Sequence, residues 1–235
     1  MKDFIAKFIS PDTRYRGMPF WAWNAELDED ELVRQINFFH KMGLGGFFMH
    51  ARVGLNTEYL GEKWFSCIRT CIQEAEKLGM HPFLYDEDRW PSGAAGSIVT
   101  RNDSFKMKEL RCQTVNSGDS LSGNTLALFT AVIDPEKRFC SNYRRINAAG
   151  EVKNGETMLN IYWQNQPRSD WFNGESYLDT MNPEAVRAFI DSTHEKYRQQ
   201  IGEKFGSAVP GIFTDEPCYL HFAKMALPWT PALPE

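Results

Sequence analysis

Acidic side chains follow two apolar runs of the sequence, at the point where each run ends. Asp86-Glu87-Asp88 comes directly after Phe83-Leu84-Tyr85, and Asp215-Glu216 comes shortly after Gly211-Ile212-Phe213. Neighbouring strands of a sheet lie about 4.8 Å apart, so carboxylates that end two such strands can approach one another. Hydrolysis of a glycosidic bond requires two carboxyl groups, of which one protonates the leaving oxygen and the other is nucleophile or base.

Two further apolar runs also end in polar residues. Asn24 follows residues 19–23, and His50 and Arg52 end the run that starts at Gly46. His50 and Arg52 are two positions apart and therefore point to the same face of a strand. Singly, each polar residue has a structural explanation, as a turn residue, a hydrogen-bonded histidine or half of an ion pair. Their recurrence at four strand ends favours one substrate-binding site, formed by Asn24, His50, Arg52, Asp86, Glu87, Asp88, Arg89, Trp90 and Asp215.

The elements that must position these residues alternate between strand and helix. A helix is expected to begin at Asp28, which forms an acidic variant of the capping box with Glu31, and to end at Gly43. Further amphipathic helices are expected over residues 62–79 and 183–201. This alternation predicts right-handed βαβ units with a parallel sheet, whose carboxyl edge is where α/β folds place their chemistry.

The stretch from residue 107 to residue 167 departs from this alternation. Its short alternating runs are separated by glycine and asparagine turns, which predicts a small antiparallel β insertion after the third strand. We expect residues 1–106 to form the first part of a (β/α) barrel and residues 168–217 to continue it with the third helix and fourth strand. Residues 218–235 are expected to be a proline-rich, poorly anchored tail.

The predicted fold class is therefore α/β, a partial (β/α)8 TIM-type barrel with about four parallel strands, their helices and the β insertion. A closed barrel needs eight strands and about 250 residues. A half-barrel would leave two open sheet edges and an uncovered inner face, and both invite association. The expected consequence is a homo-oligomer that covers the open half-barrel.

Composition narrows the classes of partner. The 31 acidic and 26 basic residues give a net charge of -5 without a basic patch, so neither nucleic acid nor a membrane is expected as a partner. Residues 1–10 lack the apolar centre of a signal peptide, which predicts a cytoplasmic protein, or a secreted or periplasmic one if a leader was removed. The five cysteines show no metal-site spacing, and no dinucleotide, phosphate-loop or nucleophile-elbow motif occurs.

Taken in order along the chain, the four polar-tipped runs resemble the start of the catalytic domain of glycoside hydrolase family 106, a family of bacterial α-L-rhamnosidases. The string Tyr85-Asp86-Glu87-Asp88-Arg89-Trp90-Pro91-Ser92-Gly93 is the most specific part of the resemblance, and Phe213-Thr214-Asp215-Glu216-Pro217 matches by position. The resemblance covers nearly the whole chain. It implies a (β/α)8 catalytic barrel, inverting hydrolysis of plant or bacterial glycans by two glutamates, a calcium requirement, and Glu216 as general acid.

Members of that family are longer, and they carry a second catalytic glutamate on a later strand. The resemblance therefore implies that this chain is catalytically incomplete, and whether it acts as an enzyme stays open. A substitute base at Asp86, Glu87 or Asp88 is disfavoured, since the family does not place its base on the third strand. Two alternatives are a non-catalytic carbohydrate-binding or self-associating module, and an open doubly wound sheet with unrelated ligand chemistry.

Overall fold

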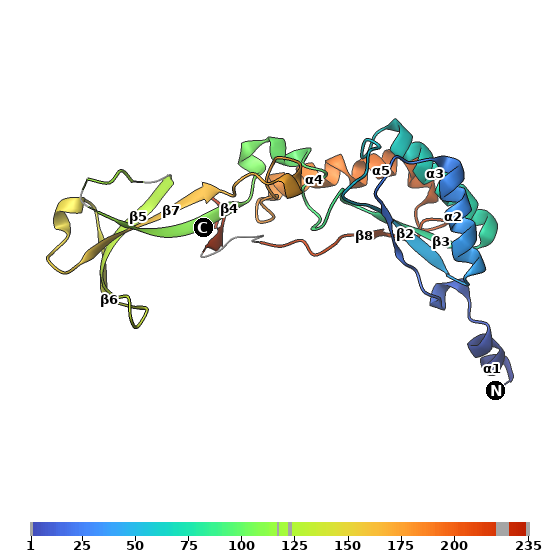
Figure 1. The fold of residues 1–235 in the computed structure, drawn as a ribbon, viewed down its shortest axis with the longest axis horizontal. Helices are drawn as coiled ribbons and strands as arrows, with labels where there is room; N and C mark the ends of the chain where they lie inside the picture. Colours follow the sequence, from blue (N-terminus) through green and yellow to red (C-terminus); the bar gives the residue numbers. More distant parts are fainter. Residues whose placement is uncertain (1, 117, 122–123, 220–225, 234–235) are drawn as a thin grey trace.

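Two separate sheets organise the chain in the computed structural model, which describes residues 2–116, 118–121, 124–219 and 226–233. They lie toward opposite ends of an elongated molecule (Figure 1). The parallel sheet has the strand order β1-β2-β3-β8, with β1 at Phe20–Trp23, β2 at Gly46–Ala51, β3 at His81–Tyr85 and β8 at Ile212–Phe213. The antiparallel sheet has the order β6-β5-β7-β4-β9, with β4 at Lys108–Val115, β5 at Asn124–Asp134, β6 at Phe139–Ile146, β7 at Thr157–Asn165 and β9 at Leu227–Trp229.

Two helices connect the first three parallel strands, as the sequence predicts. Helix α2 spans Glu29–Lys41, and its first turn is capped by the Asp28 carboxylate, which accepts the Glu31 N–H at 2.9 Å. Helix α3 spans Glu62–Leu78 and ends at Gly79, whose φ of 64° lies in the left-handed region that glycine adopts readily. Local capping chemistry therefore places both crossovers of the parallel sheet.

The main core lies between the parallel sheet and these helices. Side chains from one face of the strands, such as Trp21, Phe47 and Leu84, pack with Ile36 of α2 and Ile68 of α3. Because side chains alternate along a strand, the intervening residues point to the opposite face. Aromatic rings meet there in a cluster of Phe20, Phe48, Phe83, Tyr85 and Phe213.

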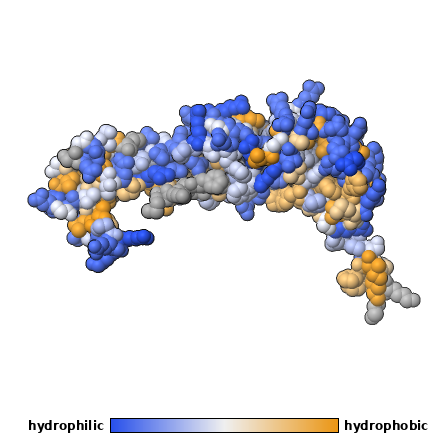
Figure 2. All heavy atoms as spheres, viewed as in Figure 1, coloured by the Kyte–Doolittle hydropathy of each residue, from blue (hydrophilic) through white to orange (hydrophobic). Residues whose placement is uncertain are grey.

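That second face is partly open to solvent. Phe20 keeps 49% of its surface exposed, and Phe48, Phe83 and Phe213 are half-buried. Figure 2 shows apolar surface over this part of the molecule and on the projecting helix α1. Among the described residues, the aromatic face of the sheet has no helical layer comparable to the one that α2 and α3 form on the other face.

The remaining helices differ in part from the expectation. The helix expected over residues 183–201 is divided into α4 at Pro183–Ser192 and α5 at His194–Ile201. The division lies at Thr193, whose φ of -116° departs from the ordinary helical value and whose hydroxyl donates to the Phe189 carbonyl at 2.8 Å. Helix α1 at Lys2–Ile9 was not predicted and projects from the end of the molecule (Figure 1).

Within the described ranges, no helix has both the length and the apolarity needed to cross a bilayer. Short 3-10 helices occupy Thr13–Tyr15, Val99–Arg101, Asp103–Phe105, Ala149–Glu151, Asp170–Phe172 and Gly202–Lys204.

Part of the stretch expected as a tail is built into the antiparallel sheet. Strand β9 pairs with β4, and Thr230 beyond it donates its hydroxyl to the buried Asp179 carboxylate at 3.0 Å. Residues 220–225 and 234–235 of that stretch lie outside the described residues.

The predicted partial (β/α)8 TIM-type barrel is wrong. The parallel strands form an open four-stranded sheet, in which the edge strand β8 is only two residues long, and the other five strands form an antiparallel sheet. The strand–helix alternation specifies which strands pair in parallel, but closure also requires strand number and stagger that the alternation does not encode. The strand order follows the chain without the reversal of a doubly wound sheet, so that alternative differs from the structure as well.

Candidate functional site

A loop from Asp86 to Ser97 occupies the carboxyl edge of the parallel sheet and is bound to the ends of two strands. Ser92 makes this connection in three ways. Its hydroxyl donates to Asp86 Oδ1 at 2.5 Å and accepts the Asp215 N–H at 2.8 Å, and its own N–H donates to the Asp215 carbonyl at 2.8 Å. The end of β3 and the segment after β8 are therefore held together by one serine.

Asp86 is fully buried, and both oxygens of its carboxylate have partners. Besides Ser92 at Oδ1, Oδ2 accepts the Thr214 hydroxyl at 2.6 Å and lies 3.3 Å from Nε2 of His194 on α5. Buried carboxylates require such partners, because an unpaired one carries a large desolvation cost. Asp86 thus fixes the positions of three surrounding elements and has no open face toward solvent.

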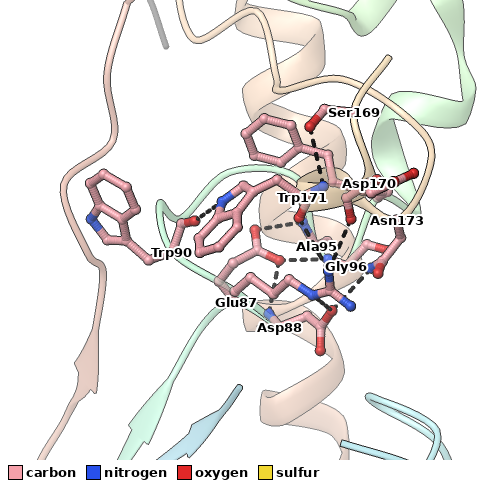
Figure 3. Close-up of polar contacts among 12 residues, drawn as sticks. Glu87, Asp88, Trp90, Ala95, Gly96, Ser169, Asp170, Trp171 and Asn173 are labelled. Atoms are coloured by element: carbon pink, nitrogen blue, oxygen red, sulfur yellow. Dashed lines mark hydrogen bonds and ion pairs between the residues drawn. The ribbon is translucent and has the colours of Figure 1, made fainter. Parts of the chain in front are cut away.

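Glu87 is buried beneath the same loop and accepts four backbone N–H groups. Those of Asp88 and Gly96 donate to Oε1, and those of Gly93 and Ala95 donate to Oε2, at 2.5 to 3.0 Å (Figure 3). Burial raises the pKa of Glu87 to about 7, against the lowering effect of these four donors. The loop closes around this carboxylate.

Gly96 shows why the loop sequence permits this closure. Its φ is +62°, and a Cβ there would lie 3.2 Å from Tyr59 and 3.3 Å from Asp88. A side chain at this position would meet both strain and crowding. The glycines of the Pro91-Ser92-Gly93-Ala94-Ala95-Gly96 stretch thus allow several N–H groups to point inward at one carboxylate.

Asp88 and Arg89 join the loop to the segment before α4. Asp88 Oδ2 accepts the Asn173 amide at 3.0 Å and lies 3.4 Å from Arg89 Nε, and the Arg89 guanidinium donates to the Asp170 carbonyl at 3.1 Å (Figure 3). Asn173 itself has a φ of 52° at the end of the 3-10 helix. Charge-assisted hydrogen bonds of this kind hold the two segments in register.

Glu216 differs from the acids of that loop because its side chain is exposed. Its Oε2 accepts the Trp90 indole N–H at 3.0 Å, and the Trp90 carbonyl in turn accepts the Trp171 indole N–H at 2.6 Å. The neighbouring Asp215 accepts the Tyr85 hydroxyl at 2.7 Å. Glu216 has a φ of +43°, a left-handed conformation that costs a residue with a side chain of order 1 kcal/mol.

His50 lies within the aromatic face rather than on an open rim. It is 6% exposed, and its ring centroid is 3.8 Å from that of Tyr85. Burial lowers the pKa of His50 to about 4, repulsion from Arg52 adds to this effect, and Asp215 opposes it. His50 is therefore neutral near pH 7, and its buried Nε2 has no hydrogen-bond partner among the described residues.

Two hollows flank the Asp86–Ser97 loop. One, of about 320 Å³, is polar and includes Arg52, Glu58, Asp88 and Arg89 in its lining. The other, of about 410 Å³, is mainly apolar and lies between the loop, α4 and the segment after β8. Both have the size of small-molecule sites.

The predicted site residues thus divide into groups. Trp90, Asp215 and Glu216 meet at the β8 side of the loop, Arg52, Asp88 and Arg89 line the polar hollow, and Asp86, Glu87 and His50 are buried. Asn24 is exposed at the end of β1, with its carbonyl close to Gly54. The sequence analysis assigned no site role to Thr214, His194, Asn173, Arg101 or Ser92. The serine beside three acids was an available signal, whereas His194 sits in an ordinary amphipathic helix pattern.

The calcium requirement that the family resemblance implies stays a prediction. Across the described ranges, no three His, Cys, Asp or Glu side chains lie together in a way that could hold a metal ion. Asp86 and Glu87, the carboxylates nearest the centre of the loop, already accept hydrogen bonds at both oxygens.

Comparison with known proteins gives a distant structural similarity only. No protein-family model matches the chain, and no curated protein matches it. Among solved structures, a rhamnosidase from Novosphingobium sp. PP1Y is similar over 54% of this chain, with 16% sequence identity and a TM-score of 0.38. This chain spans 15% of that protein's length. The similarity concerns the fold of part of the chain and assigns neither a family nor a role to any residue.

Proposed function

We propose that this chain is a glycoside hydrolase-like, carbohydrate-binding protein in which Glu216 is the general acid. The conformation of Glu216 carries the proposal. It is an exposed carboxylate in a left-handed backbone conformation, three residues after the last parallel strand and oriented by an indole N–H. Residues held in unfavourable conformations concentrate at functional sites.

Carbohydrate suits the surroundings of Glu216. Trp90 and Trp171 stand beside one another at the same edge, with the polar hollow on the other side of the loop. Aromatic rings present flat apolar surface and an N–H donor, which matches the mixed character of a sugar ring. The sequence resemblance to family 106 adds the more specific proposal of an α-L-rhamnoside substrate and inverting hydrolysis.

Inverting hydrolysis also needs a base that activates water. Asp86 and Glu87 are committed to the loop, so neither supplies that base in the described structure. We therefore propose that this chain binds its sugar and turns it over slowly. A longer chain that contributes another carboxylate would raise the turnover.

The test is hydrolysis and binding of an aryl α-L-rhamnoside by the chain, with and without added calcium. The Glu216→Gln variant is expected to abolish any turnover while retaining sugar binding, and the matched variant Glu136→Gln, at an exposed position outside the site, is expected to change neither. Turnover that survives Glu216→Gln would refute the acid role. Absence of both turnover and sugar binding would refute the proposed function.

A self-associating module is the second candidate, and the aromatic sheet face favours it. Phe20, Phe48, Phe83 and Phe213 are partly exposed on one face, and such patches are typical of interaction surfaces. Light scattering would show a dimer or larger species that dissociates in the Phe20→Ser variant. A monomer at every concentration would exclude this candidate.

A further inference from the structure

The polar hollow beside the Asp86–Ser97 loop carries an excess of positive charge. Three arginines, Arg52, Arg89 and Arg101, line it together with only two carboxylates, Asp88 and Glu58. The chain as a whole has a net charge of -5, so this hollow opposes the overall sign of the molecule. A local reversal of charge in a concave site favours ligands of the opposite charge.

The three arginine side chains differ in whether they already have hydrogen-bond or ion-pair partners. Arg89 is engaged by Asp88 and by the Asp170 carbonyl. The guanidinium groups of Arg52 and Arg101, by contrast, make no hydrogen bond or ion pair with any described residue. Arg52 is half-buried, and its position is fixed because its N–H donates to the Trp23 carbonyl at 3.0 Å. Two guanidinium groups are thus available to a ligand.

Neutral polar groups complete the lining. Asn56 and Asn173 contribute amides, and Thr57 lies beside them. Tyr59 contributes to the wall, while its hydroxyl oxygen is itself buried. The volume of about 320 Å³ is at the lower end of small-ligand sites and suits one monosaccharide unit.

We propose that this hollow binds the acidic substituent of a sugar, a carboxylate or a sulfate ester, through Arg52 and Arg101. The planar guanidinium group forms paired hydrogen bonds with carboxylates and with sulfate-like oxyanions. Arg89, which forms an ion pair with Asp88 and donates to the Asp170 carbonyl, holds the wall of the hollow. The inference rests on the proposed carbohydrate function and deepens it, because it specifies an acidic glycan as the ligand.

The test is isothermal titration calorimetry of the full chain with three monosaccharides: the methyl glycoside of galacturonic acid, whose carboxylate is free, galactose 6-sulfate and neutral methyl galactoside. The acidic sugars are expected to bind about tenfold or more tightly than the neutral one. Each of Arg52→Gln and Arg101→Gln is expected to remove about tenfold of that affinity, while Arg52→Lys retains part of it. Arg187→Gln, at an exposed position on α4, is the matched control and is expected to have no effect. Thermal unfolding of each variant verifies that the fold is retained.

The outcomes separate this inference from the function on which it rests. The carboxylate and sulfate sugars distinguish the two sources of the acidic group. Equal affinity for all three sugars, unchanged in both arginine variants, would overturn the inference and leave the carbohydrate function in place. Inorganic sulfate that binds as tightly as galactose 6-sulfate would overturn the sugar part of it. If none of the sugars binds, the inference is wrong, and the aryl rhamnoside assay with Glu216→Gln decides the function independently.

Discussion

The acids after β3 and the acid after β8 stand at the same edge of one sheet, yet their environments are opposite. Glu87 is buried and accepts four backbone N–H groups, whereas Glu216 is exposed and is oriented by one indole N–H. The difference originates in the chain around each acid. A loop with glycines at positions 93 and 96 can fold over a carboxylate, while Pro217, directly after Glu216, supplies no N–H. A carboxylate at a strand end is available for chemistry only when the N–H groups of its own loop do not already donate hydrogen bonds to its oxygens.

The Glu87→Gln variant tests the structural half of this comparison and is expected to show the largest effect. An amide retains one acceptor oxygen, but its NH2 group faces two N–H donors that lose their partner. We expect the free energy of unfolding to fall by about 4 kcal/mol, measured in urea at pH 8, above the pKa of Glu87. Glu136→Gln, at an exposed turn, is the control, with an expected change within about 0.5 kcal/mol. A loss for Glu87→Gln as small as that of the control would show that the loop does not depend on this carboxylate.

Much of the local structure was predictable from the sequence. Asp28 and Gly79 act through residues within one helical turn, so their capping roles are visible in the sequence itself. Whether the parallel sheet closes into a barrel or stays open was not predictable, because this depends on how the strands stagger and on whether further strands continue the sheet. The pairing of β9 with β4 joins residues more than 110 positions apart, and no local pattern encodes it.

The candidate site was predictable as a set of residue types but not as an arrangement. The strand ends placed Asp86, Glu87 and Glu216 at one edge, and the structure agrees. Their separation into buried and exposed acids depends on loop dihedrals, such as the φ of +62° at Gly96, that the sequence only permits. Arg101 was missed for a related reason, since it reaches the polar hollow from a 3-10 helix outside every strand end.

His50 gives a second test of how burial affects a titratable side chain. It is buried, although it lies on the aromatic face that is partly open to solvent. Its pKa of about 4 lies below the ordinary value near 6.5, so the unfolded chain binds a proton more readily than the folded one as pH falls. The neutral form of His50 therefore lets the fold keep its full stability above pH 6.5. The free energy of unfolding falls by about 2 kcal/mol as pH falls from 6.5 to 4.

The His50→Phe variant isolates this contribution. Phenylalanine fits beside the Tyr85 and Phe20 rings but does not titrate. Unfolding in urea at a series of pH values is expected to show a shallower loss of stability between pH 6.5 and 4 in the variant than in the parent chain. Parallel curves would show that His50 is protonated equally in the folded and unfolded chain.

The Trp90→Phe variant tests the exposed half of the comparison and is expected to have the smallest effect on stability. It removes the one described N–H donor to Glu216 and leaves the Trp90 carbonyl in place for Trp171. Water replaces the indole at an exposed carboxylate, so the expected loss in free energy of unfolding is at most about 1 kcal/mol. Sugar affinity is expected to weaken several-fold at the same time, because the variant loses the indole N–H and part of the aromatic surface that Trp90 offers to a sugar. A large loss of stability with unchanged sugar affinity would reverse the assignment and make the indole–carboxylate contact a structural bond of the same kind as those around Glu87.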